Sequence, residues 1–211
     1  MRAGITRRFI AGTAIVGAAA AAFVLTNSSA TAQSENAGST YRATLTELNN
    51  SNASGEATVT LKGRTLQVHI TASGLEAGGA HLSHIHGLSK GKAATDSTCP
   101  TSAQDSDGDG FVELAEGATK YGPILVDFMN IDPDQDGNVD FTTTVELSGN
   151  EDALPLQMRH IVVHGLTVGA VGAGTPGEVD GTAGYKTVLP VLCGELGNAN
   201  RSKSAMDFRT R

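Results

Sequence analysis

Three of the chain's six histidines lie within six positions, in the segment HLSHIHG at residues 81–87. In a β-strand, residues two apart project from the same face, so the imidazoles of His84 and His86 can reach one metal ion, whereas His81 has the opposite parity. A third ligand must come from a distant strand, and the best candidate is His164 in the apolar run IVVHG. An all-imidazole site with an open position suits copper, and suits zinc or nickel less distinctively.

The alternative is that His84 and His86 are ordinary sheet residues, since one H-x-H pair is a weak signal. His160 shares a strand face with His164 but lies about 13 Å along the strand at 3.3 Å per residue. It can bind the same ion only if the chain bends.

A second candidate site is acidic. The segment DSDGDGFVELAE at residues 105–116 has oxygen donors at the positions of an EF-hand loop, with glycine at the sixth position for the sharp turn. This spacing predicts a calcium loop, and the alternative is an acidic solvated turn. The expected ligands are Asp105, Asp107, Asp109, the Phe111 carbonyl, Glu113 and a bidentate Glu116.

A poorer match follows in IDPDQDGNVDF, where Thr143 stands at the position of the bidentate acid. A D-x-D-G turn between two strands is an ordinary hairpin. We therefore expect a turn there and no calcium site.

The elements that position these residues are short alternating runs. The segments YRATLTEL and GEATVTL, and TLQVHITASGL after the turn at Lys62 to Arg64, predict a β-meander. Further strands are predicted in HLSHIHGL, FTTTVEL, RHIVVHGLTV and KTVLPVLCGEL. Seven or eight short strands with glycine-rich turns indicate an all-β fold, an antiparallel Greek-key barrel or sandwich.

Two long regions without strand patterns interrupt the sheet, at residues 88–122 and 169–184. Loops of that length usually carry function or stay mobile. The polar segment 33–40 is expected to be a flexible linker, and the tail 197–211 is expected to be disordered.

The first 32 residues predict a signal peptide cleaved near Ala32, because three arginines precede an apolar run that ends in small residues. The pair Arg7-Arg8 has part of a twin-arginine export pattern, and an uncleaved anchor is the alternative. No other segment is apolar enough to span a membrane. We expect a secreted, periplasmic or cell-envelope protein.

Removal of these three arginines, with no acidic residue, changes the formal net charge from −7 to −10. Such an acidic surface argues against nucleic acid or anionic lipid as a partner. The two cysteines, Cys99 and Cys193, form an even count in an exported protein, which favours one disulfide over two buried thiols.

Across residues 41–196 the order of these features resembles the Cu/Zn superoxide dismutase family. The resemblance rests on HLSHIHG as the family's H-x-x-H-x-H strand, CPTSAQ as its cysteine segment, the region LVDFMNIDPDQDGNVDFTTTVELSG, RHIVVHG as its late copper strand, and LCGEL as the second disulfide half. It implies an eight-stranded Greek-key barrel, copper bound by His84, His86 and His164, and a Cys99 to Cys193 disulfide. His81 matches a histidine that supports the copper loop without binding metal.

The pattern departs from that family at its zinc site. No histidine occurs between His86 and His160, and only Asp127 aligns with the family's zinc carboxylate, so no zinc is expected. The position of the family's active-site arginine holds Pro190. Lys186 and Arg159 are the candidates to replace it in guiding an anion.

The meander and the segment YGPILVDF also resemble the chordin-type (CHRD) domain. Three functions therefore stay open. The leading one is superoxide dismutation to oxygen and hydrogen peroxide, with superoxide as the small substrate. The others are a non-catalytic copper-binding or copper-buffering protein and a chordin-type structural module. The oligomeric state does not follow from the sequence.

Overall fold

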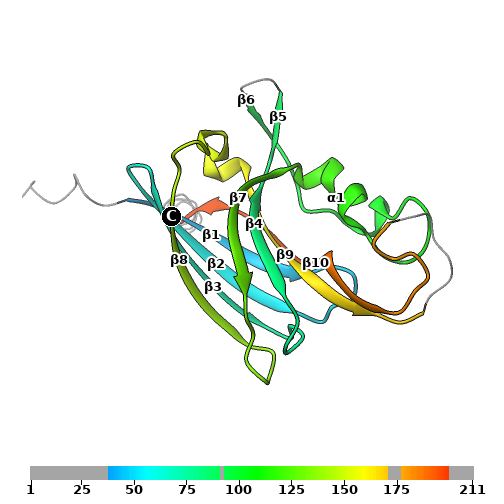
Figure 1. Ribbon diagram of the computed structural model, residues 1–211. Helices are drawn as coiled ribbons and strands as arrows, with labels where there is room; N and C mark the ends of the chain where they lie inside the picture. The colour runs from blue at the N-terminus through cyan, green and yellow to red at the C-terminus, as the bar shows by residue number, and fades with distance from the viewer. Residues whose placement is uncertain (1–37, 91–92, 171–176, 200–211) are drawn as a thin grey trace, which may run out of the picture. The chain divides into compact units, whose positions relative to one another are not determined.

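The computed structural model describes residues 38–90, 93–170 and 177–199, which form an all-β domain (Figure 1). Its main strands are β1 (Ser39–Glu47), β2 (Ser54–Lys62), β3 (Thr65–Ser73), β4 (His81–His86), β7 (Ile124–Ile131), β8 (Val139–Glu146), β9 (His160–Val168) and β10 (Gly184–Glu195). The shorter elements are β5 (Leu88–Lys90), β6 (Ala93–Thr95), α1 (Leu114–Tyr121), β11 (Gly197–Asn198) and the 3-10 turns Ser102–Gln104, Glu151–Ala153 and Leu156–Met158.

The main strands form one antiparallel sheet in the order β7-β4-β9-β10-β1-β2-β3-β8, and β11 pairs beside β10 on β1. Consecutive strands β3 and β4 are not neighbours, and neither are β8 and β9. Both connections therefore cross over other strands, which is the Greek-key arrangement. The sheet curls until its end strands β7 and β8 nearly meet, and this confirms the predicted eight-stranded barrel.

Strand alternation builds the core. In β1 the buried Tyr41, Ala43 and Leu45 alternate with exposed polar residues, and β3 repeats this pattern. The inward side chains join in one apolar cluster, and each large aliphatic side chain buried there stabilises the fold by about 1.5–3 kcal/mol. The tight turn between β2 and β3 contains Gly63 at φ 63°, a conformation that glycine adopts without strain.

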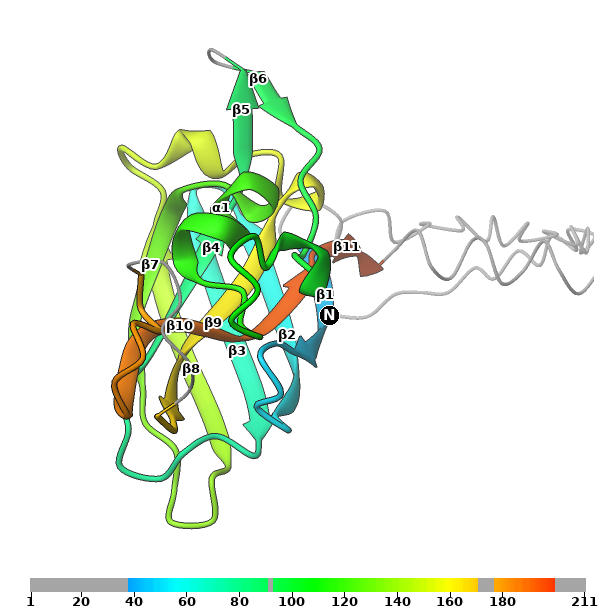
Figure 2. The ribbon, with the colours of Figure 1, turned by 90° about the vertical axis from the view of Figure 1, so that its right-hand side faces the viewer.

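Strand β9 is buried on both faces, which explains why its sequence is a continuous apolar run. Ile161 and Val163 belong to the main core. Val162, on the other face, packs with Tyr121 of α1 and with Cys193. Figure 2 shows α1 outside the sheet, and the β5–β6 hairpin extends away from it. The segment from Cys99 to the end of α1 thus folds back over the outer face of β9 and β10.

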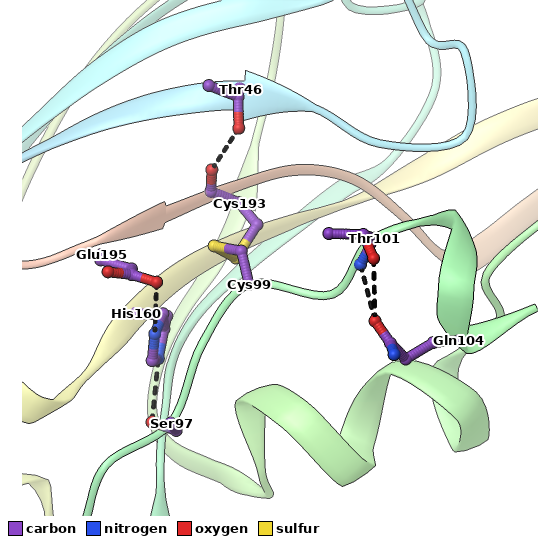
Figure 3. Close-up of a disulfide and its surroundings, with 8 residues drawn as sticks. All are labelled: Thr46, Ser97, Cys99, Thr101, Gln104, His160, Cys193 and Glu195. Carbon is purple, nitrogen blue, oxygen red and sulfur yellow. Dashed lines mark hydrogen bonds and ion pairs between the residues drawn. A yellow bond between two sulfur atoms is a disulfide. The ribbon is translucent and has the colours of Figure 1, made fainter.

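The predicted disulfide is present between Cys99, which precedes α1, and Cys193 of β10 (Figure 3). The Cys193 carbonyl accepts a hydrogen bond from Thr46 Oγ1 at 3.3 Å. The covering segment is therefore tied covalently to the centre of the sheet.

Several expected boundaries differ from the structure. Region 88–122 contains the β5–β6 hairpin and α1, which the strand and helix patterns miss because these elements are short and rich in small residues. Strand β7 was not predicted. Ser39 and Thr40, expected in the linker, belong to β1, and Gly197 and Asn198, expected in the tail, pair with it; most of both segments lies outside the described residues. The expected signal peptide lies outside the described residues.

Candidate metal centre

The structure brings the three predicted ligands together. His84 and His86 project from β4, and His164 projects from the neighbouring strand β9. One ligand atom of each lies within 4.8 Å of the others, and the ring centroids are 5.2–5.7 Å apart. The side chains are almost fully buried, with exposed fractions of 6%, 1% and 2%. Two adjacent strands present all three rings on one face.

Hydrogen bonds fix the orientation of two of the rings. His86 Nδ1 donates to the Gly122 carbonyl at 2.9 Å, and His164 Nδ1 donates to the Val188 carbonyl at 2.7 Å. A carbonyl oxygen only accepts, so the ring proton must lie on Nδ1 and the Nε2 lone pair is free. Such a bond to the second ring nitrogen is what fixes a metal-binding histidine.

One ring nitrogen of each of the three histidines is buried without a hydrogen-bond partner among the described residues. These nitrogens are His84 Nδ1, His86 Nε2 and His164 Nε2. A buried polar atom without a partner costs about 1–3 kcal/mol, so three of them in one cluster need a common explanation. A metal ion bound by these lone pairs supplies it. This buried three-histidine group could bind a metal.

Burial of the three histidines favours their neutral form, which binds metal ions. Burial lowers the pKa of His86 to about 4 and that of His164 to about 3, although their carbonyl partners oppose the shift. Burial also lowers the pKa of His84, and the charge of Asp127 opposes it. The rings are therefore neutral near pH 7, which is the form that binds a metal ion.

Two further histidines lie near the group but outside it. The ring nitrogens of His81 face the carbonyls of His164 at 3.0 Å and Glu76 at 3.1 Å, so His81 supports the strand that carries a ligand. His160 lies opposite His86 on the neighbouring strand. Its ring lies between Ser97 Oγ at 3.1 Å and a Glu195 carboxylate oxygen at 3.9 Å (Figure 3).

Asp127, the residue aligned with a zinc carboxylate, lies beside His84. Its Oδ1 is 3.5 Å from His84 Nε2, and the two residues are opposite each other on β7 and β4. Asp127 does not belong to either group of potential metal ligands in the described residues. Its contact is with a ring that already belongs to the three-histidine group.

The candidate cations for anion guidance are engaged elsewhere. Arg159 is 1% exposed, and its guanidinium donates to backbone carbonyls that include those of Leu88 and Asp152. The Lys186 ammonium lies 3.1 Å from Asp180 Oδ1. Pro190 lies opposite His164 in the sheet. Arg159 is therefore a buried structural group that holds the connection between β8 and β9.

The acidic loop is partly assembled. Asp105, Asp107 and Asp109 form the second group of potential metal ligands, and one buried oxygen of Asp109 has no hydrogen-bond partner in the described part of the chain. Burial and the neighbouring acids raise the pKa of Asp109. Phe111 packs at a small apolar cluster around Val179.

Glu113 and Glu116, the last two predicted ligands of the acidic loop, lie outside this group and accept hydrogen bonds from backbone N–H groups. Glu116 accepts hydrogen bonds from the backbone of Ser106 and Glu113. Glu113 accepts from the Val179 N–H, and Glu178 in turn accepts from the Leu114 N–H at 3.0 Å. These reciprocal bonds join the acidic loop to the segment at residues 177–179.

The second acidic segment forms a turn between β7 and β8, but not the expected hairpin, because these two strands are not paired with each other. The Asp134 N–H donates to Asn138 at 2.8 Å, and Gly137 has φ 78°. The two strands it joins end the sheet at opposite sides and do not form a ladder with each other.

Sequence reasoning missed the groups that orient the ligands. The carbonyls of Gly122 and Val188 carry no signal of their own in the sequence, and Tyr121 packs edge-on against His86 with centroids 4.8 Å apart. The E-x-x-E pair of Glu113 and Glu116 is a capping box and was the one available signal for the start of α1.

Fold and site together define a disulfide-linked, all-β Greek-key barrel with a buried three-histidine group. No protein-family model matches the chain, and no curated protein matches it. The disulfide is consistent with an oxidising, extracellular compartment. In the described part of the chain, no helix has the length and apolarity needed to cross a membrane.

Proposed function

We propose that this protein is an exported copper protein that dismutes superoxide at His84, His86 and His164. One observation carries the proposal: three buried imidazole nitrogens without hydrogen-bond partners converge on one point. Imidazole suits copper, and neutral rings with no carboxylate among the ligands favour it over calcium or magnesium. When bound, copper would supply the one-electron couple that oxidises one superoxide to oxygen and reduces a second, with two protons, to hydrogen peroxide.

The protein's own contribution is to hold and orient the ligands. The Gly122 and Val188 carbonyls keep the ring protons away from the metal side. Tyr121 and the disulfide-tethered segment cover the rings and exclude bulk water. Three protein ligands leave a position for a small ligand of the size of superoxide.

The resemblance to Cu/Zn superoxide dismutases adds support. The segments HLSHIHG and RHIVVHG, matched to two copper strands, are neighbours in the sheet, and the matched cysteines are bonded. The Greek-key order is the topology that the resemblance implied. The signal-like N-terminus and the disulfide both favour a location outside the cytoplasm.

A second candidate function is non-catalytic copper binding or buffering. It is favoured by the engaged state of Arg159 and Lys186 and by Pro190 at the position of the family's arginine. With both candidate cations engaged, a protein of net charge near −10 attracts an anion poorly, and this lowers the rate without removing the chemistry.

The acidic loop adds a calcium proposal. Calcium at residues 105–116 would offset two of the three negative charges of the grouped aspartates and stiffen the loop from which α1 begins. The helix ends beside Gly122, the partner of His86. The loop is also hydrogen-bonded to Glu178 and Val179, in the segment that leads to Val188, the partner of His164. Calcium would thus support both oriented histidines indirectly.

The test is superoxide decay by residues 33–211 loaded with one copper, beside His164→Ala and the surface control His69→Ala. We expect metal-dependent decay that only His164→Ala abolishes. Decay no faster than free copper, with copper tightly bound, would establish the buffering protein. A chordin-type module without a redox metal predicts that neither variant changes copper binding.

A further inference from the structure

We infer that Asp127 is a positioning residue of the metal centre, which orients His84 through its Nε2–H and makes the site favour the more highly charged Cu(II). This inference rests on the proposed function and assigns a residue that the ligand set does not include. Its basis is the contact between Asp127 Oδ1 and His84 Nε2 at 3.5 Å.

The three ligands differ in what their second ring nitrogen contacts. His86 and His164 each donate to a neutral backbone carbonyl, whereas His84 faces a carboxylate. The nearby carboxylate favours the tautomer of His84 with its proton on Nε2, which leaves the buried, unpartnered Nδ1 as the lone-pair donor. The negative charge also makes that imidazole a stronger base. Among the three, only His84 is oriented by a charged group.

A bulge in the backbone of β7 places Asp127 opposite His84. Leu82 lies opposite Asn130, but His84 lies opposite Asp127, so β7 contains one extra residue between the two pairs. Without this bulge, Phe128 would lie opposite His84. Phe128 is 2% exposed and belongs to the core. The bulge therefore exchanges an apolar neighbour of His84 for an acidic one.

The bulge contains a strained residue. Met129 has φ 69°, a conformation that costs a non-glycine residue about 1–2 kcal/mol, and its side chain is 67% exposed. Asp127 Oδ1 accepts the Met129 N–H at 2.6 Å and so stabilises this conformation. The same oxygen, Asp127 Oδ1, therefore accepts the Met129 N–H and lies 3.5 Å from His84 Nε2. Strain of this kind, beside a ligand, is typical of functional positions.

Asp127→Asn separates the charge from the geometry, because the amide oxygen can still accept from Met129 and from His84. The matched control is Asp140→Asn, which removes a carboxylate from an exposed pair with His69 at 2.8 Å, outside the site. Both variants change the net charge equally, so a general electrostatic effect would appear in both.

The experiment measures Cu(II) and Cu(I) dissociation constants by competition titration, on the full chain isolated after export. For Asp127→Asn we expect Cu(II) binding to weaken 10–100-fold, with Cu(I) binding changed less than threefold. A tenfold change in the ratio of the two constants equals a rise of about 59 mV in reduction potential. The electron paramagnetic resonance spectrum of the Cu(II) form should also change. Asp140→Asn should match the wild type in each measurement.

Equal weakening of both oxidation states, or no change in either, would overturn the inference, because a structural role does not discriminate between them. A wild type that binds copper but leaves superoxide decay unchanged refutes the dismutase while the affinity ratio still decides the role of Asp127. A wild type that binds no copper overturns both proposals.

Discussion

His86 and Gly122 are joined by a hydrogen bond of 2.9 Å from the ring Nδ1 to the carbonyl just beyond the end of α1. This contact connects a proposed ligand to the segment that the disulfide anchors. Thr98, next to Cys99, donates to the Lys120 carbonyl at 3.2 Å, two residues before Gly122. The disulfide is thus connected to His86 through the C-terminal end of α1.

Replacing both cysteines by serine should therefore weaken both folding and metal binding. The bond spans 94 residues, and the chain-entropy relation gives a loss of at most about 4–5 kcal/mol in the free energy of unfolding. Urea denaturation with and without copper measures both effects. Unchanged copper affinity in a destabilised variant would show that Gly122 holds its position without the disulfide.

Acid should destabilise the metal-free protein. The pKa values of His86 and His164 in the folded state, about 4 and about 3, lie below the ordinary value of 6.5. Between these values the unfolded chain binds more protons, so stability is complete above pH 6.5 and falls as the pH decreases. Each histidine contributes a slope of up to about 1.4 kcal/mol per pH unit in this window.

Denaturant midpoints of the metal-free protein at pH 7.5, 6.0 and 5.0 test this expectation. The variant His86→Gln should show a shallower decline, since it removes one of the groups. A midpoint that stays constant down to pH 5 would mean that the rings already carry protons in the folded protein or are exposed.

Calcium should raise the melting temperature of the wild type. A ligand at one hundred times its dissociation constant stabilises the folded state by about 2.7 kcal/mol. Asp109→Asn, in the grouped acids, should remove the effect. Asp136→Asn, in the turn between β7 and β8, should retain it. Calcium-independent melting and copper affinity in the wild type would refute the loop's proposed role.

Arg159→Lys should destabilise the fold by about 3 kcal/mol or more, because a lysine cannot satisfy the several buried carbonyls that the guanidinium contacts. The exposed Arg64 gives the control Arg64→Lys, which should have little effect. The rate of superoxide decay per bound copper should stay unchanged in both variants. A rate that falls only in Arg159→Lys would instead assign Arg159 to anion guidance.

The sequence could predict those parts of the fold that depend on alternation and spacing. The inward residues of β1 and β3, the glycine turn between β2 and β3, and the shared face of His84 and His86 all follow from a period of two. His164 was predictable because a histidine in the middle of an apolar run needs a partner or a metal. The cysteine pairing followed from an even count.

The features that were not predictable depend on backbone geometry. The bulge at Met129 places Asp127 beside His84, and no residue type in LVDFMNI marks that distortion. The carbonyls of Gly122 and Val188 belong to residues whose side chains play no part in the contact. Helix α1 has only eight residues, so its apolar side, Leu114, Ala118 and Tyr121, is too short a pattern to predict a helix.

The reciprocal bonds between Glu113 and Val179, and between Glu178 and Leu114, also constrain how this protein can evolve. Shortening either loop alone would leave the carboxylate of Glu113, which is 5% exposed, without its partner. Insertions and deletions in the two loops are therefore expected to occur together across a lineage. Exchange of loops between relatives should succeed only when both are transferred as a pair.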